Sequence, residues 1–245
     1  MTPQQLKNSI LQQAVEGKLV EQRPEEGTGE ELYQRIQKEK QKLIKEGKIK
    51  KEKPLPPITD GEIPFEIPEN WKWMRLCQLG IFSSGKTPSM QNKEYWENGS
   101  IPWITSKDMK FNILKDSQMH ITKKAAMQMN MYPKGTLLMV VRSGILKRHL
   151  PLCILGIDST INQDIKAFSL IDSKLSKWIY YVLLGREPYI IHNLVKHITT
   201  VESLKFKEFE NMLIPLPPLK EQKRIVAKVE ELLPLCEQLK KTEES

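Results

Sequence analysis

The stretch Ile214-Pro-Leu-Pro-Pro-Leu-Lys-Glu-Gln-Lys-Arg-Ile-Val-Ala-Lys-Val-Glu-Glu-Leu-Leu233 decides the fold of this chain. It opens on a group of three prolines, Pro215, Pro217 and Pro218. Proline fixes φ and lacks a backbone N–H, so these residues stiffen the approach to the helix that is predicted from Leu219 onward.

The predicted helix carries the apolar repeat of a coiled coil. The apolar residues are spaced 4, 3, 4 and 3 apart, at Ile225, Val229, Leu232, Cys236 and Leu239. A seam this narrow, flanked by charges, predicts a partner helix. The alternative is a single amphipathic helix packed on its own domain. Pro234 lies off the seam but removes a backbone donor, so we expect a kink or an early end there.

The opposite end of the chain is also predicted to be helical. Leu6, Ile10 and Ala14 form one apolar stripe of a helix over residues 4–20. A second helix, rich in Lys and Glu, is expected over residues 30–46 and ends before Gly47. A charged and then proline-rich segment follows it, which predicts an extended linker.

Short apolar runs typical of strands fill the middle of the chain. The strongest buried-strand pattern covers residues 136–142, and Pro102 argues that the strand over residues 101–105 lies at a sheet edge. We therefore predict an α+β fold: a globular domain with a mixed, mostly antiparallel sheet, N-terminal helices and a long C-terminal coiled-coil helix. The predicted regions are helical 1–53, linker 54–70, globular domain 71–214 and spacer helix 215–245.

The composition favours an anionic partner. The 245 residues include 38 Lys and Arg against 30 Asp and Glu, a formal net charge of +8, and nucleic acid is the first candidate. A solvated Lys/Glu helix on a soluble protein is the plainer explanation. Three distant cysteines support neither a disulfide framework nor a zinc site. No signal-peptide or membrane-spanning pattern occurs, so we expect a cytoplasmic protein without a membrane partner.

One motif raises the alternative of a nucleotide-binding enzyme. Gly80-Ile-Phe-Ser-Ser-Gly85-Lys86-Thr87 satisfies the phosphate-loop pattern, in which backbone donors cradle phosphates at the start of a helix. The residues after Thr87 show no apolar helical stripe. Two further alternatives are a DNA nuclease that uses Asp164 and Lys166, and a helical adaptor with no DNA role. The histidines show no metal-ligand spacing, so no metal site is predicted.

Basic and hydroxyl residues gather in the segments between predicted strands. Cations and short hydroxyls suit phosphate contacts, while Arg, Asn, Gln and Ser can read base edges. The predicted DNA-binding residues are Lys86, Thr87, Ser89, Lys93, Ser106, Lys107, Lys110, Arg142, Ser143, Lys147, Arg148, Asn162, Gln163, Lys196, Thr199 and Thr200. No catalytic residue is predicted.

These residues carry a resemblance to the specificity subunit of type I restriction-modification systems. Residues 6–19 resemble its helical opening, and Ser84-Gly-Lys-Thr-Pro-Ser89 with residues 101–109 resembles the start of a target recognition domain. The most specific match is Pro-Leu-Pro-Pro-Leu followed by Glu221-Gln222 and Arg224-Ile-Val226. Family members usually have a second Gly where Lys86 stands, so the phosphate-loop pattern arises here by accident.

The resemblance implies a non-catalytic reader of double-stranded DNA. Its recognition domain would contact one half of a split target, and its helices would act as a ruler and dock the methyltransferase (modification) subunits. A restriction subunit would join them. The chain itself would hold no cofactor, since S-adenosylmethionine, ATP and magnesium are expected only in partner subunits.

Two departures from the family pattern matter. Family members usually carry two recognition domains and two helical regions, whereas this sequence shows one of each, as expected of a half-subunit or a fragment. Two copies would then pair as a homodimer through the seam of the C-terminal helix. The other departure is His197-Ile-Thr-Thr200, which replaces the usual Gly-Ser/Thr-Thr element.

Overall fold

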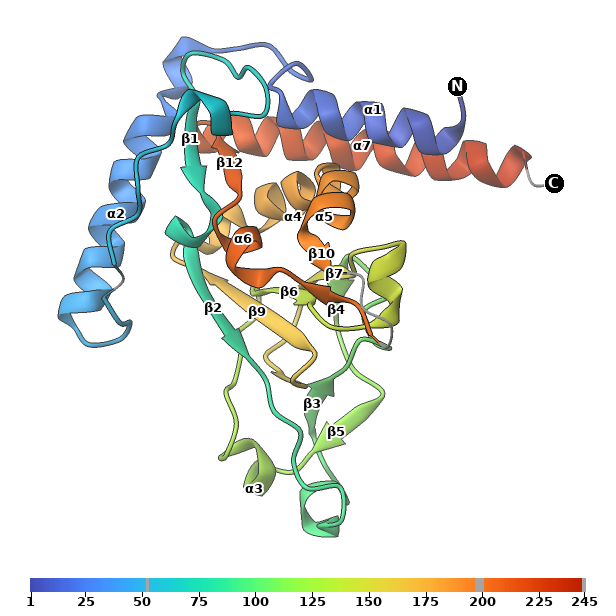
Figure 1. Ribbon diagram of the computed structural model, residues 1–245. Coiled ribbons are helices and arrows are strands. Elements are labelled where there is room, and N and C mark those ends of the chain that lie inside the picture. Colours follow the sequence, from blue (N-terminus) through green and yellow to red (C-terminus); the bar gives the residue numbers. More distant parts are fainter. Residues whose placement is uncertain (52, 197–200, 244–245) are drawn as a thin grey trace. The chain divides into compact units, whose positions relative to one another are not determined.

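A computed structural model of the protein describes residues 1–51, 53–196 and 201–243, which form two compact units (Figure 1). Unit 1 comprises Met1–Leu79, Lys177–Arg186 and Asn211–Ser245, and unit 2 comprises Gly80–Ser176 and Glu187–Glu210. The predicted regions follow chain order. Unit 1 instead joins segments from both ends of the chain with one from its middle.

Two antiparallel helices dominate unit 1. Helix α1 (Pro3–Val15) lies beside α7 (Leu219–Glu243), as Figure 1 shows in blue and red. Thr2 starts α1 with a capping box, in which its hydroxyl accepts from the Gln5 backbone and the Gln5 side chain accepts from the Thr2 backbone.

The seam of α7 is largely covered within the chain. Ile225, Val229 and Cys236 are buried, and Leu232 is half-buried. Leu239 stays 50% exposed. The partner helix that the repeat predicts is therefore α1 of the same chain over most of the seam. Of the kink or early end expected at Pro234, the early end does not occur, because α7 continues to Glu243 with Pro234 inside it and on its exposed side.

The rest of unit 1 packs around a two-stranded ladder. Strand β1 (Lys72–Arg75) pairs antiparallel with β12 (Leu213–Leu216). Helix α2 (Gly29–Lys45) begins against this ladder, where a Cβ on Gly29 would lie 2.1 Å from the Leu216 oxygen. Helix α4 (Ser176–Gly185) adds Trp178, whose indole Nε1 donates to the Pro215 oxygen over 3.0 Å.

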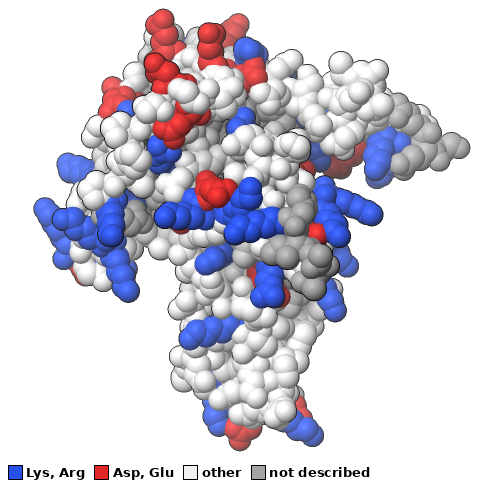
Figure 2. All heavy atoms as spheres, viewed as in Figure 1, with Lys and Arg blue, Asp and Glu red and all other residues white. Residues whose placement is uncertain are grey.

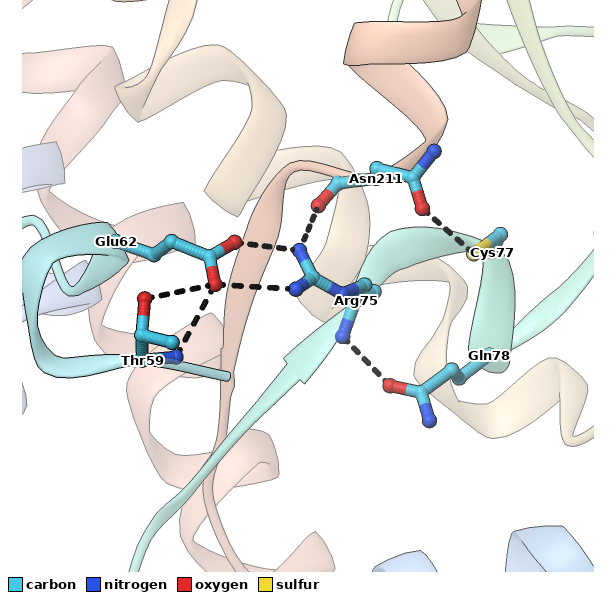
Figure 3. Close-up of polar contacts among 6 residues, drawn as sticks. All are labelled: Thr59, Glu62, Arg75, Cys77, Gln78 and Asn211. Carbon is cyan, nitrogen blue, oxygen red and sulfur yellow. Dashed lines mark hydrogen bonds and ion pairs between the residues drawn. The ribbon is translucent and has the colours of Figure 1, made fainter. Parts of the chain in front are cut away.

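An ion pair fixes the segment before β1 to the ladder. Figure 3 shows the Arg75 guanidinium donating to both oxygens of Glu62, at 2.8 and 3.2 Å, and to the Asn211 carbonyl oxygen at 3.3 Å. The Arg75 side chain is buried, so its charge depends on Glu62 for compensation.

Unit 2 contains a five-stranded sheet with the order β2-β9-β6-β7-β4. Neighbouring strands are antiparallel except β4 and β7. The strands are β2 (Gly80–Ser84), β4 (Ile113–Leu114), β6 (Leu137–Val140), β7 (Leu152–Leu155) and β9 (Ile165–Leu170).

A second sheet of three strands has β3 at its centre. Strand β3 (Ile101–Ile104) is antiparallel to β5 (Met119–Ile121) and parallel to β8 (Thr160–Ile161). Ile104 and Ile161 share one core with Leu138, Val140 and Ile165 of the larger sheet. The predicted edge position of Pro102 is wrong. It is tolerated in the centre because β8 pairs with β3 only from Trp103 onward.

Shorter elements complete unit 2. They are α3 (Lys123–Ala126), α5 (Glu187–Leu194), β10 (Val195–Lys196), β11 (Ser203–Leu204) and α6 (Phe206–Glu210). Single turns of 3-10 helix occur at Pro24–Glu26, Asp60–Glu62, Leu76–Gln78, Lys93–Tyr95, Gly144–Lys147 and Ser173–Leu175. The predicted α+β class with mostly antiparallel sheets is confirmed. Across the described ranges, no helix is both long enough and apolar enough to cross a bilayer.

Candidate nucleic-acid interface

Most of the predicted DNA-binding residues lie at one end of the five-stranded sheet. Strand β2 ends where β9 begins, with Ser84 opposite Lys166. Strand β6 ends at the same place, with Val140 opposite Ile165. Strand β7 is antiparallel to β6, and β4 is parallel to β7, so both begin there. We call this the basic end, defined as residues 85–89, 105–112, 141–151 and 162–164.

The segment after β2 is fixed to the segment before β9. The Lys86 backbone N–H donates to the Ile161 oxygen at 3.0 Å, and the Lys86 oxygen accepts from Trp103 Nε1 at 3.0 Å. Gly85 is required by this close approach, because a Cβ there would lie 1.9 Å from the Ile161 oxygen. The Thr87 hydroxyl donates to the Gln163 amide oxygen. These bonds leave the Lys86 side chain in solvent.

The loop between β6 and β7 is the second part of the basic end. Arg142 forms a β-bridge with Ser203, and Ser203 in turn pairs with Lys196 on β10. Ser203 therefore lies between Arg142 and Lys196, and the pairing places both cations on neighbouring strands of one ladder, although about 50 residues separate them in the sequence. Both side chains are exposed.

A buried carboxylate reduces the charge of this loop. Lys147 Nζ lies 3.2 Å from Glu202 Oε1, and the Glu202 side chain is only 3% exposed. The Ser143 backbone N–H donates to the Glu202 carbonyl oxygen at 3.1 Å, and the Ser143 hydroxyl accepts from the Ile145 backbone. Lys147 is thus partly neutralised, whereas Arg142 and Arg148 have no ion pair among the residues that the structure describes.

The loop between β3 and β4 is the third part. Its turn is held by Asp108, which is buried and accepts from the Thr105 backbone (2.8 Å), the Thr105 hydroxyl (2.9 Å) and the Gln118 backbone (2.8 Å). With Asp108 satisfied internally, Lys107 and Lys110 face solvent without a carboxylate partner in the described part of the chain.

Several predicted residues lie elsewhere. Asn162 is at the basic end but buried, where its amide oxygen accepts from the Asp164 backbone and its nitrogen donates to the Asp164 carboxylate. It holds the turn rather than facing a ligand. Lys93 lies beside α3, at the opposite end of β3, and 4.0 Å from Glu97. Thr199 and Thr200 fall outside the described residues.

The predicted residues that the structure does bring together are Lys86, Thr87, Ser89, Ser106, Lys107, Lys110, Arg142, Ser143, Lys147, Arg148 and Gln163, with Lys196 one strand further on, across Ser203. The sequence interpretation did not identify two neighbours. Ser203 shows no distinctive pattern because its role depends on a β-bridge. Phe111 could have been found as a lone large apolar residue between Lys110 and Asn112.

Unit 2 also carries positive charge outside the basic end. Figure 2 shows Lys and Arg atoms in a band over the region of α6 and β10, whereas the tip that carries the segment between β2 and β3 shows both signs. Ion pairs such as Lys124 with Glu94 account for the mixed charge of that tip.

The backbone is incompatible with a phosphate loop. Gly80–Ser84 forms strand β2 in full antiparallel register with β9, so these residues do not form a cradle. The described residues directly after Lys86 form no helix, and the next element is the single 3-10 turn Lys93–Tyr95. The helix N-terminus that binds phosphate in such sites is therefore missing from this part of the described structure.

The nuclease alternative also lacks support. Asp164 is engaged by Asn162, and Lys166 Nζ lies 4.7 Å from the centre of the Phe206 ring. The described residues contain no group of three or more His, Cys, Asp or Glu side chains that could hold a metal ion. Burial raises the pKa of the Cys153 thiol to about 12, which suppresses its nucleophilic thiolate form.

A comparison with protein families identifies the chain's relatives. The family described as type I restriction modification DNA specificity domain matches residues 68–245. The chain belongs to this family. The resemblance to the specificity subunit that the sequence carries is confirmed by this match, and the relatives found are specificity subunits.

Individual relatives agree with the specificity family. The EcoR124I/EcoR124II specificity subunit of Escherichia coli is 36% identical over 157 residues, which cover 63% of this chain and 39% of that subunit. The Escherichia coli EcoAI specificity subunit is 33% identical and matches 96% of this chain but 40% of its own length. The chain thus spans about two fifths of these relatives.

A solved structure shows the same fold. The crystal structure of the HsdS subunit from Thermoanaerobacter tengcongensis matches 73% of this chain and 41% of its own, with a TM-score of 0.52 and 22% identity.

Proposed function

We propose that this specificity domain reads one half of a split DNA target through its basic end, within a type I restriction-modification complex. The observation that supports the proposal is the convergence of three loops, with exposed Lys86, Lys107, Lys110 and Arg142, at one end of one sheet. Exposed cations on loops that a sheet positions suit a polyanion with a regular backbone.

The residues of the basic end divide into two roles in this proposal. The exposed lysines contact phosphates, which sets position and affinity without selecting a sequence. Gln163, hydrogen-bonded to Thr87, and Arg142 have side chains that can pair with base edges in the major groove. Methylation and cleavage, with S-adenosylmethionine, ATP and magnesium, belong to the modification and restriction subunits.

We also propose that the paired helices α1 and α7 form the spacer and the docking surface for the modification subunits. The Arg224 guanidinium bonds both oxygens of Glu26, at 2.9 and 2.7 Å, and Gln22 donates to the buried Glu221 at 2.7 Å. These contacts make α7 part of a stiff frame, which a ruler requires.

Co-expression with the modification subunit tests the DNA-reading proposal. The host genome is then mapped for methylated adenines, and the expected result is a split motif absent from cells that lack this chain. Direct titration of duplex DNA with the purified complex complements the map. A complex that forms but shows neither methylation nor salt-dependent DNA affinity contradicts the proposal.

A second copy of the chain would supply the other half-site. The end of α7 supports this arrangement, because Leu235 and Leu239 are each 50% exposed on its last turns. An isologous pairing of these ends would give a two-fold object that suits a palindromic split site. Sedimentation of the purified chain, alone and with DNA, should show a dimer. A strict monomer under both conditions rejects it.

A further inference from the structure

Phe111 is a large apolar side chain exposed at the basic end. It is 69% exposed, and its neighbour Ile113 is 44% exposed. A single exposed apolar residue on a protein surface is ordinary. The position of Phe111 is informative because of what holds it and what surrounds it.

The backbone on both sides of Phe111 is fixed. Before it, Met109 is buried, and the Lys110 backbone N–H donates to the Asp108 oxygen at 2.8 Å. After it, the Asn112 oxygen accepts from the Ile154 backbone at 2.8 Å, where β4 joins the sheet. The exposed ring is therefore carried by an anchored loop. Because the backbone of this loop is already ordered, binding a ligand would cost little further backbone entropy.

The charged residues that flank Phe111 in its loop are mostly positive, and Asp116, just after the loop, pairs with His120. Lys107, Lys110 and Lys115 are exposed, and the one carboxylate between residues 105 and 115 is Asp108, which is buried and already hydrogen-bonded. An aromatic ring between exposed lysines matches a ligand with aromatic bases on an anionic backbone. An apolar protein surface would gain nothing from these lysines.

We propose that Phe111 is an aromatic wedge that stacks on the bases of the bound duplex and opens one base step. This inference rests on the proposed DNA-reading function and adds a mode of recognition to it. Apolar side chains inserted between base steps partly unstack and kink DNA, and the deformability of the step then contributes to sequence selection.

The test uses the full chain in complex with its modification subunit. The probe is a duplex enriched from a randomised pool by this complex, with 2-aminopurine replacing one adenine at a time. The expected result is a rise in 2-aminopurine fluorescence at one step, which Phe111→Ala abolishes together with about a tenfold loss of affinity. Phe111→Tyr keeps the ring and should restore both readouts.

The matched control is Met127→Ala. Met127 is also exposed and apolar but follows α3, which lies at the opposite end of β3 from the basic end. Its replacement should change neither readout. DNA binding without any position-specific fluorescence change overturns the wedge and leaves the proposed function intact. Loss of the modification subunit by Phe111→Ala, with unchanged DNA affinity, assigns the ring to a protein interface and also overturns it. Failure of the unmodified complex to bind DNA rejects the proposed function itself.

Discussion

Arg142 is positioned by its backbone, and it forms no ion pair with any residue that the structure describes. Its β-bridge to Ser203 fixes the Cα, while the guanidinium remains exposed. Lys147 in the same loop is held by the buried Glu202. A cation that is positioned but not neutralised releases the most counterions when it meets a phosphate, so Arg142 is the better probe of the interface.

We expect Arg142→Ala to weaken DNA binding and to reduce the slope of log K against log salt concentration by about 1. Lys124→Ala removes the same charge from α3, where Lys124 is paired with Glu94. It should leave affinity and slope nearly unchanged. Fluorescence anisotropy titrations at several salt concentrations measure both. Equal losses in the two variants would show that net charge, and not the basic end, governs binding.

Glu62 links stability to pH at the other unit. The hydrogen bonds from Arg75 (Figure 3) lower the pKa of the Glu62 carboxyl from 4.5 to about 2. The unfolded carboxyl therefore binds a proton more readily than the folded one. The stability that the ionised Glu62 carboxylate adds to the folded chain is fully present above pH of about 4.5 and is lost as the pH falls through about 2.

We expect Glu62→Gln to be less stable than the unmodified chain near neutral pH, with the difference shrinking as the pH falls from about 4.5 to about 2. Urea unfolding at a series of pH values measures this difference. Glu66→Gln, an exposed carboxylate nearby, is the control and should show no such trend. A Glu62→Gln deficit that does not depend on pH would contradict the linkage.

The sequence around Lys86 matches a motif whose structure the chain does not adopt. The letters of a phosphate loop fit residues 80–87, but the register with β9 makes Gly80–Ser84 a strand. The partner strand β9 lies more than 80 residues away in the sequence, so no local pattern predicts the pairing. The apolar helix that should follow is absent from the letters after Thr87, and that absence was the usable signal.

Among the elements, α7 was predicted well and its partner was not. The 4-3-4-3 repeat correctly predicts a long helix with one buried stripe. The repeat cannot distinguish a partner in another chain from one in the same chain, because both cover the same residues. The structure places α1 there, which had been predicted as a helix but not as this partner.

We expect Ile225→Ala to cost about 2–4 kcal/mol of unfolding free energy, because it opens a cavity between α7 and its neighbours. Ile225 is 1% exposed. Leu239→Ala shortens a half-exposed side chain of the same seam and should cost far less. Thermal or urea unfolding of the two variants compares them. Similar losses would mean that the whole seam, and not only its covered part, supports the folded chain.

Strand prediction succeeded where residues are buried on both faces. Leu137–Val140 is buried throughout and reads as a continuous apolar run. In contrast, β4, β8, β10 and β11 have two residues each, too few for any periodicity. They are strands only because distant segments pair with them. The three loops of the basic end that carry Lys and Arg could thus be identified from the sequence as basic, but not as neighbours.

At the scale of the whole molecule, the chain enters unit 2 and leaves it twice. Lys177–Arg186 returns to unit 1 between the two segments of unit 2. Composition marks the linker and the helices, but it carries no sign that α4 belongs with the chain's ends. That assignment depends on contacts such as the Trp71 and Trp178 rings, whose centres are 5.6 Å apart.

We expect Leu235→Glu combined with Leu239→Glu to convert a dimer of the chain into monomers, because four carboxylates would then face one another across the two-fold axis. Both residues are half-exposed, so folding of the monomer should be unaffected. Sedimentation velocity measures the change. Met127→Glu, an exposed apolar residue of the other unit, is the control. A dimer that survives the double change must use another surface.

Because α4 returns the chain to unit 1, it constrains how unit 2 can be exchanged between relatives. The antiparallel pair β1 and β12 holds the outer joints of unit 2 close together, with Arg75 opposite Leu213. On this pairing alone, joining a donor segment at these two points would be enough to exchange unit 2. Any donor segment nevertheless brings its own α4, and with it the side chain that must bond the Pro215 oxygen as Trp178 does. A working chimaera therefore has to be matched at α4, inside the exchanged segment, and not only at its ends.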